Sequence, residues 1–197
     1  MNAAIWWESQ IERDYIYLLE SDPIVLSYKS QPFSMNYTSQ GKKRTYTPDF
    51  WVKRADFQQA VEVKPITQIN TEKNQKLFHY INLLCQEKGL DFVVVTDRMI
   101  RIQPKLDNLK LLYKYARTPL TLNKYLDCQR YFRNREATSL KQVWQELEPR
   151  GISKNLLYKL LYIGALQTDL MQPISSESLI QLSPFQGDVF RIATGPI

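Results

Sequence analysis

Two apolar segments separated by a helical pattern occupy residues 61–96, and this succession restricts the possible folds most. Val61–Val63 alternates with charged residues as a strand does, and Asp91–Thr96 has the continuous apolar character of a buried strand. Between them, apolar side chains recur at helical spacing from Thr71 to Lys88, and Gly89 can end the helix. A strand, a helix and a strand in this order predict a right-handed parallel crossover.

The residues before this crossover predict a helix and an antiparallel meander. Residues 8–20 have an amphipathic pattern, and Ser21, Asp22 and Pro23 end it. Extended segments are expected at 24–28 and 31–37, with a polar hairpin tip at 39–44. The chain then returns through 45–53 and runs out at 59–64, which gives three antiparallel strands. The first hundred residues therefore predict an α/β domain with a mixed sheet flanked by helices.

Charged residues stand on two of these predicted strands. Asp49 follows Thr47-Pro48, and Glu62 and Lys64 alternate with Val61 and Val63 so that they share one strand face. Two carboxylates and an ammonium on adjacent strands can hold a divalent cation and activate water. The alternative is a Pro-Asp turn and a solvated ion pair, which contributes little to stability.

Composition narrows the chemistry that such a chain can perform. No run of about 18 apolar residues occurs, and no charged segment followed by an apolar one opens the chain, so neither a membrane span nor a signal peptide is expected. A cytoplasmic protein without membrane contacts is the expectation. Cys85 and Cys128 are isolated, and His79 is the only histidine, so carboxylates and lysines must do any chemistry.

Basic residues accumulate in the C-terminal half. Residues 1–104 hold 13 basic and 12 acidic side chains and residues 105–197 hold 13 and 8, so most of the net charge of +6 lies after residue 104. Tyrosines are interleaved with the basic residues of 105–135, a mixture that suits a phosphate backbone. A solvated helix face explains the same pattern. The candidate DNA-binding residues are Lys42, Lys43, Arg44, Lys114, Arg117, Lys124, Arg130 and Arg133.

The pattern after Pro104 is helical, with helices expected near 106–116, 119–134, 138–148 and 153–164. The last two have helix-turn-helix proportions, and short strands at 165–169 and 178–182 would add a wing. The apolar character of 153–164 equally favours a helical domain that packs against a protein. We therefore predict two domains, a catalytic domain at 1–104 and a smaller all-α or winged-helix-like domain at 105–197 that binds DNA, a partner or both.

Five short runs give the first domain a resemblance to a known family. In chain order they are Glu8-Ser-Gln-Ile-Glu-Arg-Asp14, Leu18-Leu-Glu-Ser-Asp-Pro23, Gln31-Pro32, Tyr46-Thr-Pro-Asp-Phe50 and Val61-Glu-Val-Lys-Pro65. Together they resemble the TnsA-type endonuclease subunit of heteromeric transposases. That family has a restriction-endonuclease-like domain of the PD-(D/E)xK class followed by a winged-helix-like domain.

The resemblance implies a set of catalytic residues. Asp49 matches the metal-binding aspartate, and Glu62 matches the second acidic position, which binds metal together with the carbonyl of Val63. Lys64 matches the lysine that orients or deprotonates the attacking water. Glu12 matches the first-helix glutamate that completes the site, with Glu8 as the other candidate. One or two Mg²⁺ ions, replaceable by Mn²⁺, are the implied cofactor.

The resemblance also implies a reaction and partners. Such subunits cut double-stranded DNA at the 5′ ends of a transposon and leave a 5′ phosphate and a 3′ hydroxyl. A DDE transposase of the TnsB type cuts and joins the 3′ ends, and an AAA+ ATPase of the TnsC type regulates both. Two alternatives stay open: a stand-alone restriction- or repair-type nuclease of the same fold, and a non-catalytic winged-helix module that binds or bridges DNA.

Overall fold

The computed structural model describes residues 5–184. The chain divides into two compact units between Ile102 and Gln103, two residues before the boundary that the sequence suggests. Residues 1–4 and 185–197, the outer ends of the two predicted domains, lie outside the described part. Each unit has its own hydrophobic core.

A four-stranded mixed sheet forms the centre of the N-terminal unit. Its strands are β1 (Val25–Ser30), β4 (Phe50–Arg54), β5 (Gln58–Lys64) and β6 (Asp91–Thr96), in the order β1-β4-β5-β6. Strand β4 runs antiparallel to β1 and β5, whereas β6 runs parallel to β5. The prediction of a mixed sheet with a parallel crossover is confirmed.

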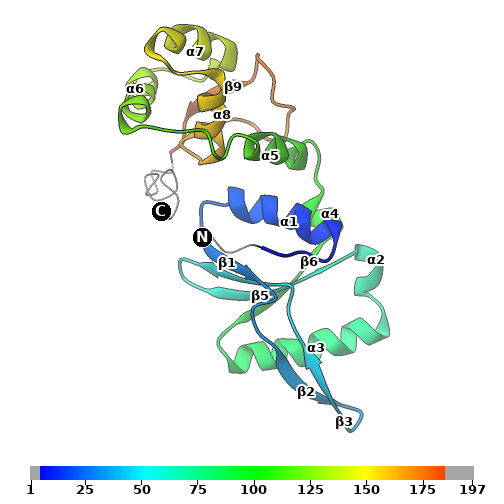
Figure 1. Ribbon diagram of the computed structural model, residues 1–197. Helices are drawn as coiled ribbons and strands as arrows, with labels where there is room; N and C mark the ends of the chain where they lie inside the picture. Colours follow the sequence, from blue (N-terminus) through cyan, green and yellow to red (C-terminus); the bar gives the residue numbers. More distant parts are fainter. Residues whose placement is uncertain (1–4, 185–197) are drawn as a thin grey trace. The chain divides into compact units, whose positions relative to one another are not determined.

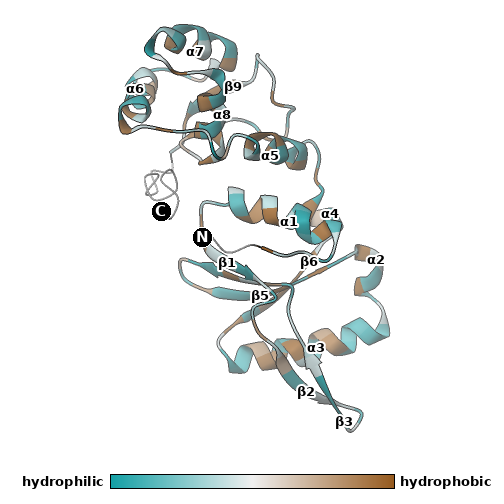
Figure 2. Cartoon of the chain, viewed as in Figure 1, coloured by the Kyte–Doolittle hydropathy of each residue, from teal (hydrophilic) through white to brown (hydrophobic). Residues whose placement is uncertain are grey.

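Helices cover both faces of this sheet (Figure 1). They are α1 (Gln10–Ser21), α2 (Ile66–Ile69), α3 (Glu72–Glu87) and α4 (Asp97–Ile100). Tyr15 and Leu19 of α1 pack with Val61 and Val63 of β5. Ile81 and Cys85 of α3 pack with Ala60 of the same strand, on the opposite face. Figure 2 shows both hydrophobic and hydrophilic residues along α3, as expected for a helix that buries one side.

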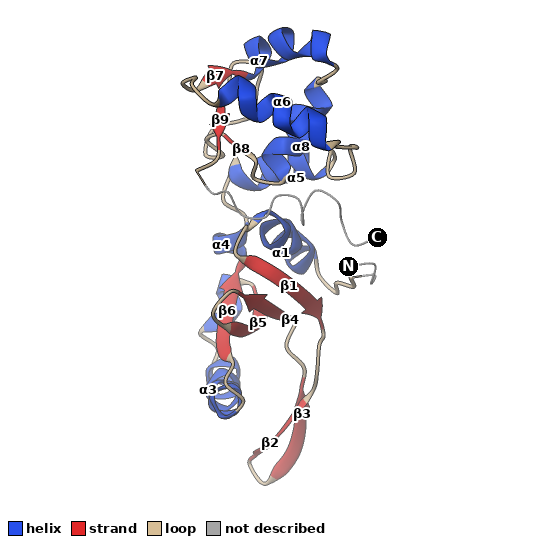
Figure 3. Ribbon diagram, turned by 90° about the vertical axis from the view of Figure 1, so that its left-hand side faces the viewer, coloured by secondary structure: helices blue, strands red, loops and turns tan. Residues whose placement is uncertain are grey.

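A separate hairpin corrects the predicted meander. Strands β2 (Met35–Ser39) and β3 (Lys42–Tyr46) pair only with each other among the described residues, and they project from the end of the four-stranded sheet (Figure 3). The single strand expected at 45–53 is interrupted between β3 and β4. Pro48 lies in this interruption and has no amide hydrogen to donate to a sheet. The turn is confined to Gln40 and Gly41, so the three cations that follow lie on β3 and not at the hairpin tip.

The C-terminal unit combines helices with a small sheet. Its elements are α5 (Lys105–Tyr113), α6 (Leu122–Phe132), β7 (Thr138–Ser139), α7 (Leu140–Leu147), the 3₁₀ turn η1 (Glu148–Arg150), α8 (Lys154–Tyr162), β8 (Leu166–Gln167) and β9 (Leu179–Leu182). The sheet order is β7-β9-β8, and all its pairs are antiparallel. Strands β8 and β9 fall within the two predicted wing segments, whereas β7 was not expected.

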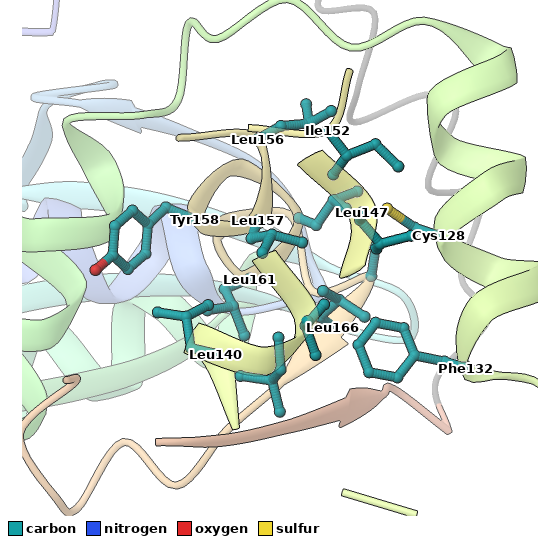
Figure 4. Close-up of a cluster of buried hydrophobic side chains, with 14 of the residues drawn as sticks. Cys128, Phe132, Leu140, Leu147, Ile152, Leu156, Leu157, Tyr158, Leu161 and Leu166 are labelled. Atoms are coloured by element: carbon teal, nitrogen blue, oxygen red, sulfur yellow. The ribbon is translucent and has the colours of Figure 1, made fainter. Parts of the chain in front are cut away.

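Helix α8 lies at the centre of this unit's core. All residues from Leu156 to Leu161 are buried, and Leu157 and Leu160 have no exposed surface. Figure 4 shows several of these side chains in one cluster with Cys128, Phe132 and Leu147 from other helices. Even Lys159 is buried, where its ammonium donates a hydrogen bond to the carbonyl of Ala116. Within residues 5–184, no helix has the length and apolar character that crossing a membrane requires.

Candidate active site

One edge of β5 remains open where its partner strand ends, and Asp49 occupies that edge. The β4–β5 pairing stops at Phe50 and Val61, so Val63 lies beyond the end of β4. There the amide of Val63 donates a hydrogen bond of 2.7 Å to Oδ2 of Asp49. Because the N–H and C=O of one residue in a strand point to the same side, the carbonyl of Val63 faces the same edge.

Glu62 places a second carboxylate beside this edge. The alternation along β5 turns its side chain to the α3 face, together with Lys64 and away from Val61 and Val63. Glu62 is only 4% exposed. Its Oε1 lies 2.7 Å from Nζ of Lys64, and its Oε2 accepts a hydrogen bond of 2.5 Å from the hydroxyl of Tyr46.

Burial and the nearby acidic groups together set the pKa of Asp49. Burial raises its pKa most, and the charge of Glu62 raises it further. The Val63 amide and the Lys64 ammonium lower it but do not compensate, so the pKa of Asp49 rises to about 7. The site therefore carries more negative charge than its own cation can balance, a condition that favours binding of a cation.

Lys64 is the cation of this group. Burial lowers the pKa of its ammonium, but the hydrogen bond to Glu62 and the charges of the surrounding carboxylates raise it by more, so the net shift is upward. Its side chain is 29% exposed. Lys64 is thus a charged ammonium at neutral pH that reaches from the Glu62 carboxylate toward solvent.

Glu12 approaches from α1, on the other face of the sheet. It is 9% exposed, and its charge raises the pKa of both Asp49 and Lys64. Both of its carboxylate oxygens already accept hydrogen bonds, one from the Ser9 hydroxyl at 2.7 Å and one from the Glu8 amide at 2.9 Å. Ser9 is the N-cap of α1 and in turn accepts a hydrogen bond from the Glu12 amide, so Ser9 and Glu12 cap the helix reciprocally, with the Glu8 amide in place of the Ser9 amide of a standard capping box.

The Glu8 side chain, in contrast, is exposed and accepts a hydrogen bond from Gln31 at 2.7 Å. The helix predicted over 8–20 begins at Gln10, so Glu8 precedes it, and of the two candidates Glu12 is the one whose charge acts on Asp49. The structure thus brings Asp49, Glu62, Val63 and Lys64 together, with Glu12 nearby.

The carboxylates have separate partners in this arrangement. Within residues 5–184, no three His, Cys, Asp or Glu side chains are grouped as a ready-made metal site. Glu62 is held by Tyr46 and Lys64, Glu12 by the helix cap, and Asp49 by Val63. Oδ1 of Asp49 accepts no hydrogen bond from the described residues, which leaves one carboxylate oxygen available at the edge.

The predicted DNA-binding residues fall on both units. Lys42, Lys43 and Arg44 are exposed on β3, the strand that leads through Thr47-Pro48 to Asp49. The others lie in the C-terminal unit, around the end of α5 and along α6: Lys114, Arg117, Lys124, Arg130 and Arg133. Arg130 is paired with Asp127 at 3.0 Å.

Sequence reasoning missed a hydrogen-bond partner of two site residues, Ser9 beside Glu12 and Tyr46 beside Glu62. The Ser9-x-x-Glu12 pattern is a recognisable capping box and could have indicated the structural role of Glu12. The contact between Tyr46 and Glu62 joins residues 16 positions apart. Nothing in the local pattern around Tyr46 signals it.

Comparison with known proteins gives a family match over most of the N-terminal unit. Residues 22–97 match the family model described as the TnsA-like endonuclease N-terminal domain. The match contains Asp49, Glu62 and Lys64, whereas Glu12 precedes it. A search of curated proteins gave no match. The strand order, the acidic edge of β5 and the family match lead to one assignment: residues 22–97 of the N-terminal unit form a domain similar to the TnsA-like endonuclease N-terminal domain.

Proposed function

We propose that this chain is the Mg²⁺-dependent endonuclease subunit of a transposase and that it cuts DNA at the 5′ ends of a transposon. The observation that carries the proposal is the convergence of Asp49, Glu62 and Lys64 at the open edge of β5. Two carboxylates with an adjacent ammonium suit the hydrolysis of a phosphodiester, whose transition state gains negative charge. The TnsA-like match supports the same reaction class.

The donor set fits a divalent cation. Asp49 has an available carboxylate oxygen, Glu62 is an adjacent carboxylate, and the carbonyl of Val63 faces the same edge. Hard oxygen ligands of this kind are those that Mg²⁺ prefers. When bound, one or two Mg²⁺ ions would polarise the scissile phosphate and lower the pKa of a water molecule, and Mn²⁺ could replace them.

We assign supporting roles to Lys64 and Glu12. The ammonium of Lys64 orients the attacking water and offsets charge on the phosphate, because its raised pKa makes proton abstraction by a neutral amine unfavourable. Glu12 adds negative charge from the α1 side. Since its two oxygens cap the helix, we expect it to act through charge or a bridging water unless the cap opens. The expected products are a 5′ phosphate and a 3′ hydroxyl.

DNA contacts are proposed on the hairpin and on the C-terminal unit. Lys42, Lys43 and Arg44 have no ion-pair partner among the described residues, so their charge is available to phosphates. The order α6, β7, α7, α8, β8, β9 with sheet order β7-β9-β8 supports a winged-helix-like domain. In this domain most of α8 is buried, so we expect DNA contacts from exposed basic residues of other elements, such as those of α6 and the α5–α6 connection.

A comparison of the protein alone and with its proposed partners tests this function. Cleavage of transposon-end DNA in Mg²⁺ would be measured with and without a TnsB-type DDE transposase and a TnsC-type AAA+ ATPase. We expect 5′-end cuts that need the transposase and disappear with Asp49→Asn. Efficient cutting without any partner would instead favour a stand-alone nuclease. Identical behaviour of the wild type and Asp49→Asn would contradict the catalytic proposal and favour a non-catalytic DNA-bridging module.

A further inference from the structure

Tyr46 is a buried residue that links the β2–β3 hairpin to the candidate active site. It is the last residue of β3 and is 8% exposed. Its ring packs edge-on against Phe92 of β6, with 6.4 Å between centroids, and belongs to the core cluster with Ala60 and Ile81. The ring is therefore fixed by packing, and its hydroxyl has a defined position.

That hydroxyl donates a hydrogen bond to Oε2 of Glu62, while Lys64 contacts Oε1. A carboxylate has about four lone-pair positions, so these two donors leave room for further ligands. They also fix the rotation of the group about its last bond, because each donor holds a different oxygen. The Tyr46 donor comes from the rigid core, whereas the Lys64 donor sits on a long and partly exposed chain.

The loss of the Tyr46 hydroxyl would leave Glu62 with Lys64 as its remaining side-chain donor among the described residues. A buried carboxylate without enough donors is costly, and Glu62 would then turn toward the ammonium. Such a rotation would misplace an oxygen ligand at the β5 edge and would draw Lys64 away from the scissile phosphate. Donors that orient a ligating carboxylate typically change metal affinity or activity by about 10- to 100-fold when they are removed.

We propose that Tyr46 is a positioning residue of the nuclease site, whose hydroxyl holds the Glu62 carboxylate in the orientation that binds the divalent cation. This inference rests on the proposed function, since it assumes that Glu62 is a ligand. It assigns a role in the reaction to a residue outside the Asp-Glu-Lys set.

The chain offers a matched control. The hydroxyl of Tyr28, another buried tyrosine, donates a hydrogen bond to Glu20. Tyr28→Phe removes the same group as Tyr46→Phe, but Glu20 is near the end of α1 and has no part in the proposed site. A general effect of losing a buried tyrosine hydroxyl should therefore appear in both variants.

The experiment measures Mn²⁺ binding to the full chain by calorimetry for the wild type, Tyr46→Phe, Tyr28→Phe and Asp49→Asn. Melting curves define a temperature at which all four proteins are folded. We expect Tyr46→Phe to weaken Mn²⁺ binding by about tenfold, Tyr28→Phe to leave it unchanged and Asp49→Asn to abolish it. The Mg²⁺ concentration for half-maximal cleavage of end DNA should rise by a similar factor in Tyr46→Phe.

A double-mutant cycle separates positioning from a structural effect. If Tyr46 acts through Glu62, then Tyr46→Phe should have no further effect on Mn²⁺ affinity in a Glu62→Gln background. Equal Mn²⁺ affinities of Tyr46→Phe and Tyr28→Phe, with binding lost in Asp49→Asn, would overturn the role of Tyr46 alone. Unchanged binding and cleavage in Asp49→Asn would instead overturn the proposed function itself.

Discussion

The backbone amide of Val63 donates a 2.7 Å hydrogen bond to the carboxylate of Asp49 at the position where β4 no longer pairs with β5. The Asp49 side chain thus accepts a hydrogen bond from a strand amide that would otherwise lack a partner. This hydrogen bond also holds the carboxylate at the sheet edge. Because the Asp49 side chain takes the place of a strand at this edge, Pro48, which has no amide hydrogen to donate, is tolerated just before β4.

Replacement of Asp49 by Asn should stabilise the protein. Because the pKa of Asp49 rises to about 7 in the folded state, its ionised form opposes folding, and this unfavourable contribution grows as pH increases from about 4 through 7. In the absence of metal, Asp49→Asn should raise the free energy of unfolding by almost nothing at pH 4 and by roughly 2–4 kcal/mol at pH 8. Urea denaturation at several pH values measures it. Exposed Asp56 supplies the control Asp56→Asn, and an equal gain in both variants would contradict the charge crowding.

Loss of the Lys64 ammonium should affect turnover and stability together. Lys64→Ala removes the proposed charge-offsetting group, so we expect the rate of a single turnover to fall by about 100-fold or more. Glu62 would keep only Tyr46 as donor, which should lower the free energy of unfolding by about 1–3 kcal/mol. Lys53→Ala, on the exposed side of β4, is the control. Full activity of Lys64→Ala would exclude the proposed role.

The cations of β3 should determine part of the salt dependence of DNA binding. Replacement of Lys42, Lys43 and Arg44 by Ala should reduce the slope of log affinity against log salt by about 2–3, since each phosphate contact contributes about 0.9. Lys73→Ala with Lys88→Ala removes one exposed charge from the first turn of α3 and one just after its end, and should change the slope less. Fluorescence anisotropy at several salt concentrations distinguishes the two sets, and equal slopes would argue against a DNA contact on the hairpin.

Helix α8 should behave as a core element. Leu157 has no exposed surface, so Leu157→Ala should lower the free energy of unfolding by about 2–5 kcal/mol. Asn155, an exposed residue on the same helix, should tolerate Ala within about 0.5 kcal/mol, and Asn155→Glu should leave DNA affinity nearly unchanged. A marked loss of DNA affinity in Asn155→Glu would support the alternative hypothesis that α8 enters a DNA groove.

The local patterns of the sequence predict much of the N-terminal unit. Strict alternation on β5 and the apolar run of β6 identify the crossover, and Glu62 and Lys64 share a face as expected. The antiparallel hairpin around Gln40 and Gly41 is confirmed, but its inclusion in one meander with β4 and β5 was wrong, because extended segments do not show which strands share a sheet. Register between distant strands depends on tertiary packing, here the packing of Met35 and Tyr46 with α3.

The site shows the same division between local and long-range information. Residue types and spacing identify Asp49, Glu62 and Lys64 as candidates, and the resemblance adds Glu12. Charge crowding and the Tyr46 contact arise only when separate elements meet, so no local pattern contains them. Likewise, the apolar sequence of 153–164 is compatible with both a groove-reading helix and a core helix. The burial of Leu156 to Leu161 depends on tertiary packing, which the local sequence does not show.

The rate of DNA cleavage as a function of Mg²⁺ concentration tests the central claim most directly. Single-turnover cutting of labelled transposon-end DNA would be followed for the wild type and Asp49→Asn, assembled with the partner transposase. We predict a rate that rises to saturation with Mg²⁺, is abolished by EDTA and is absent in Asp49→Asn, with a 5′ phosphate at the cut. Cleavage that persists in EDTA, or at the wild-type rate in Asp49→Asn, would contradict a metal-dependent nuclease centred on Asp49.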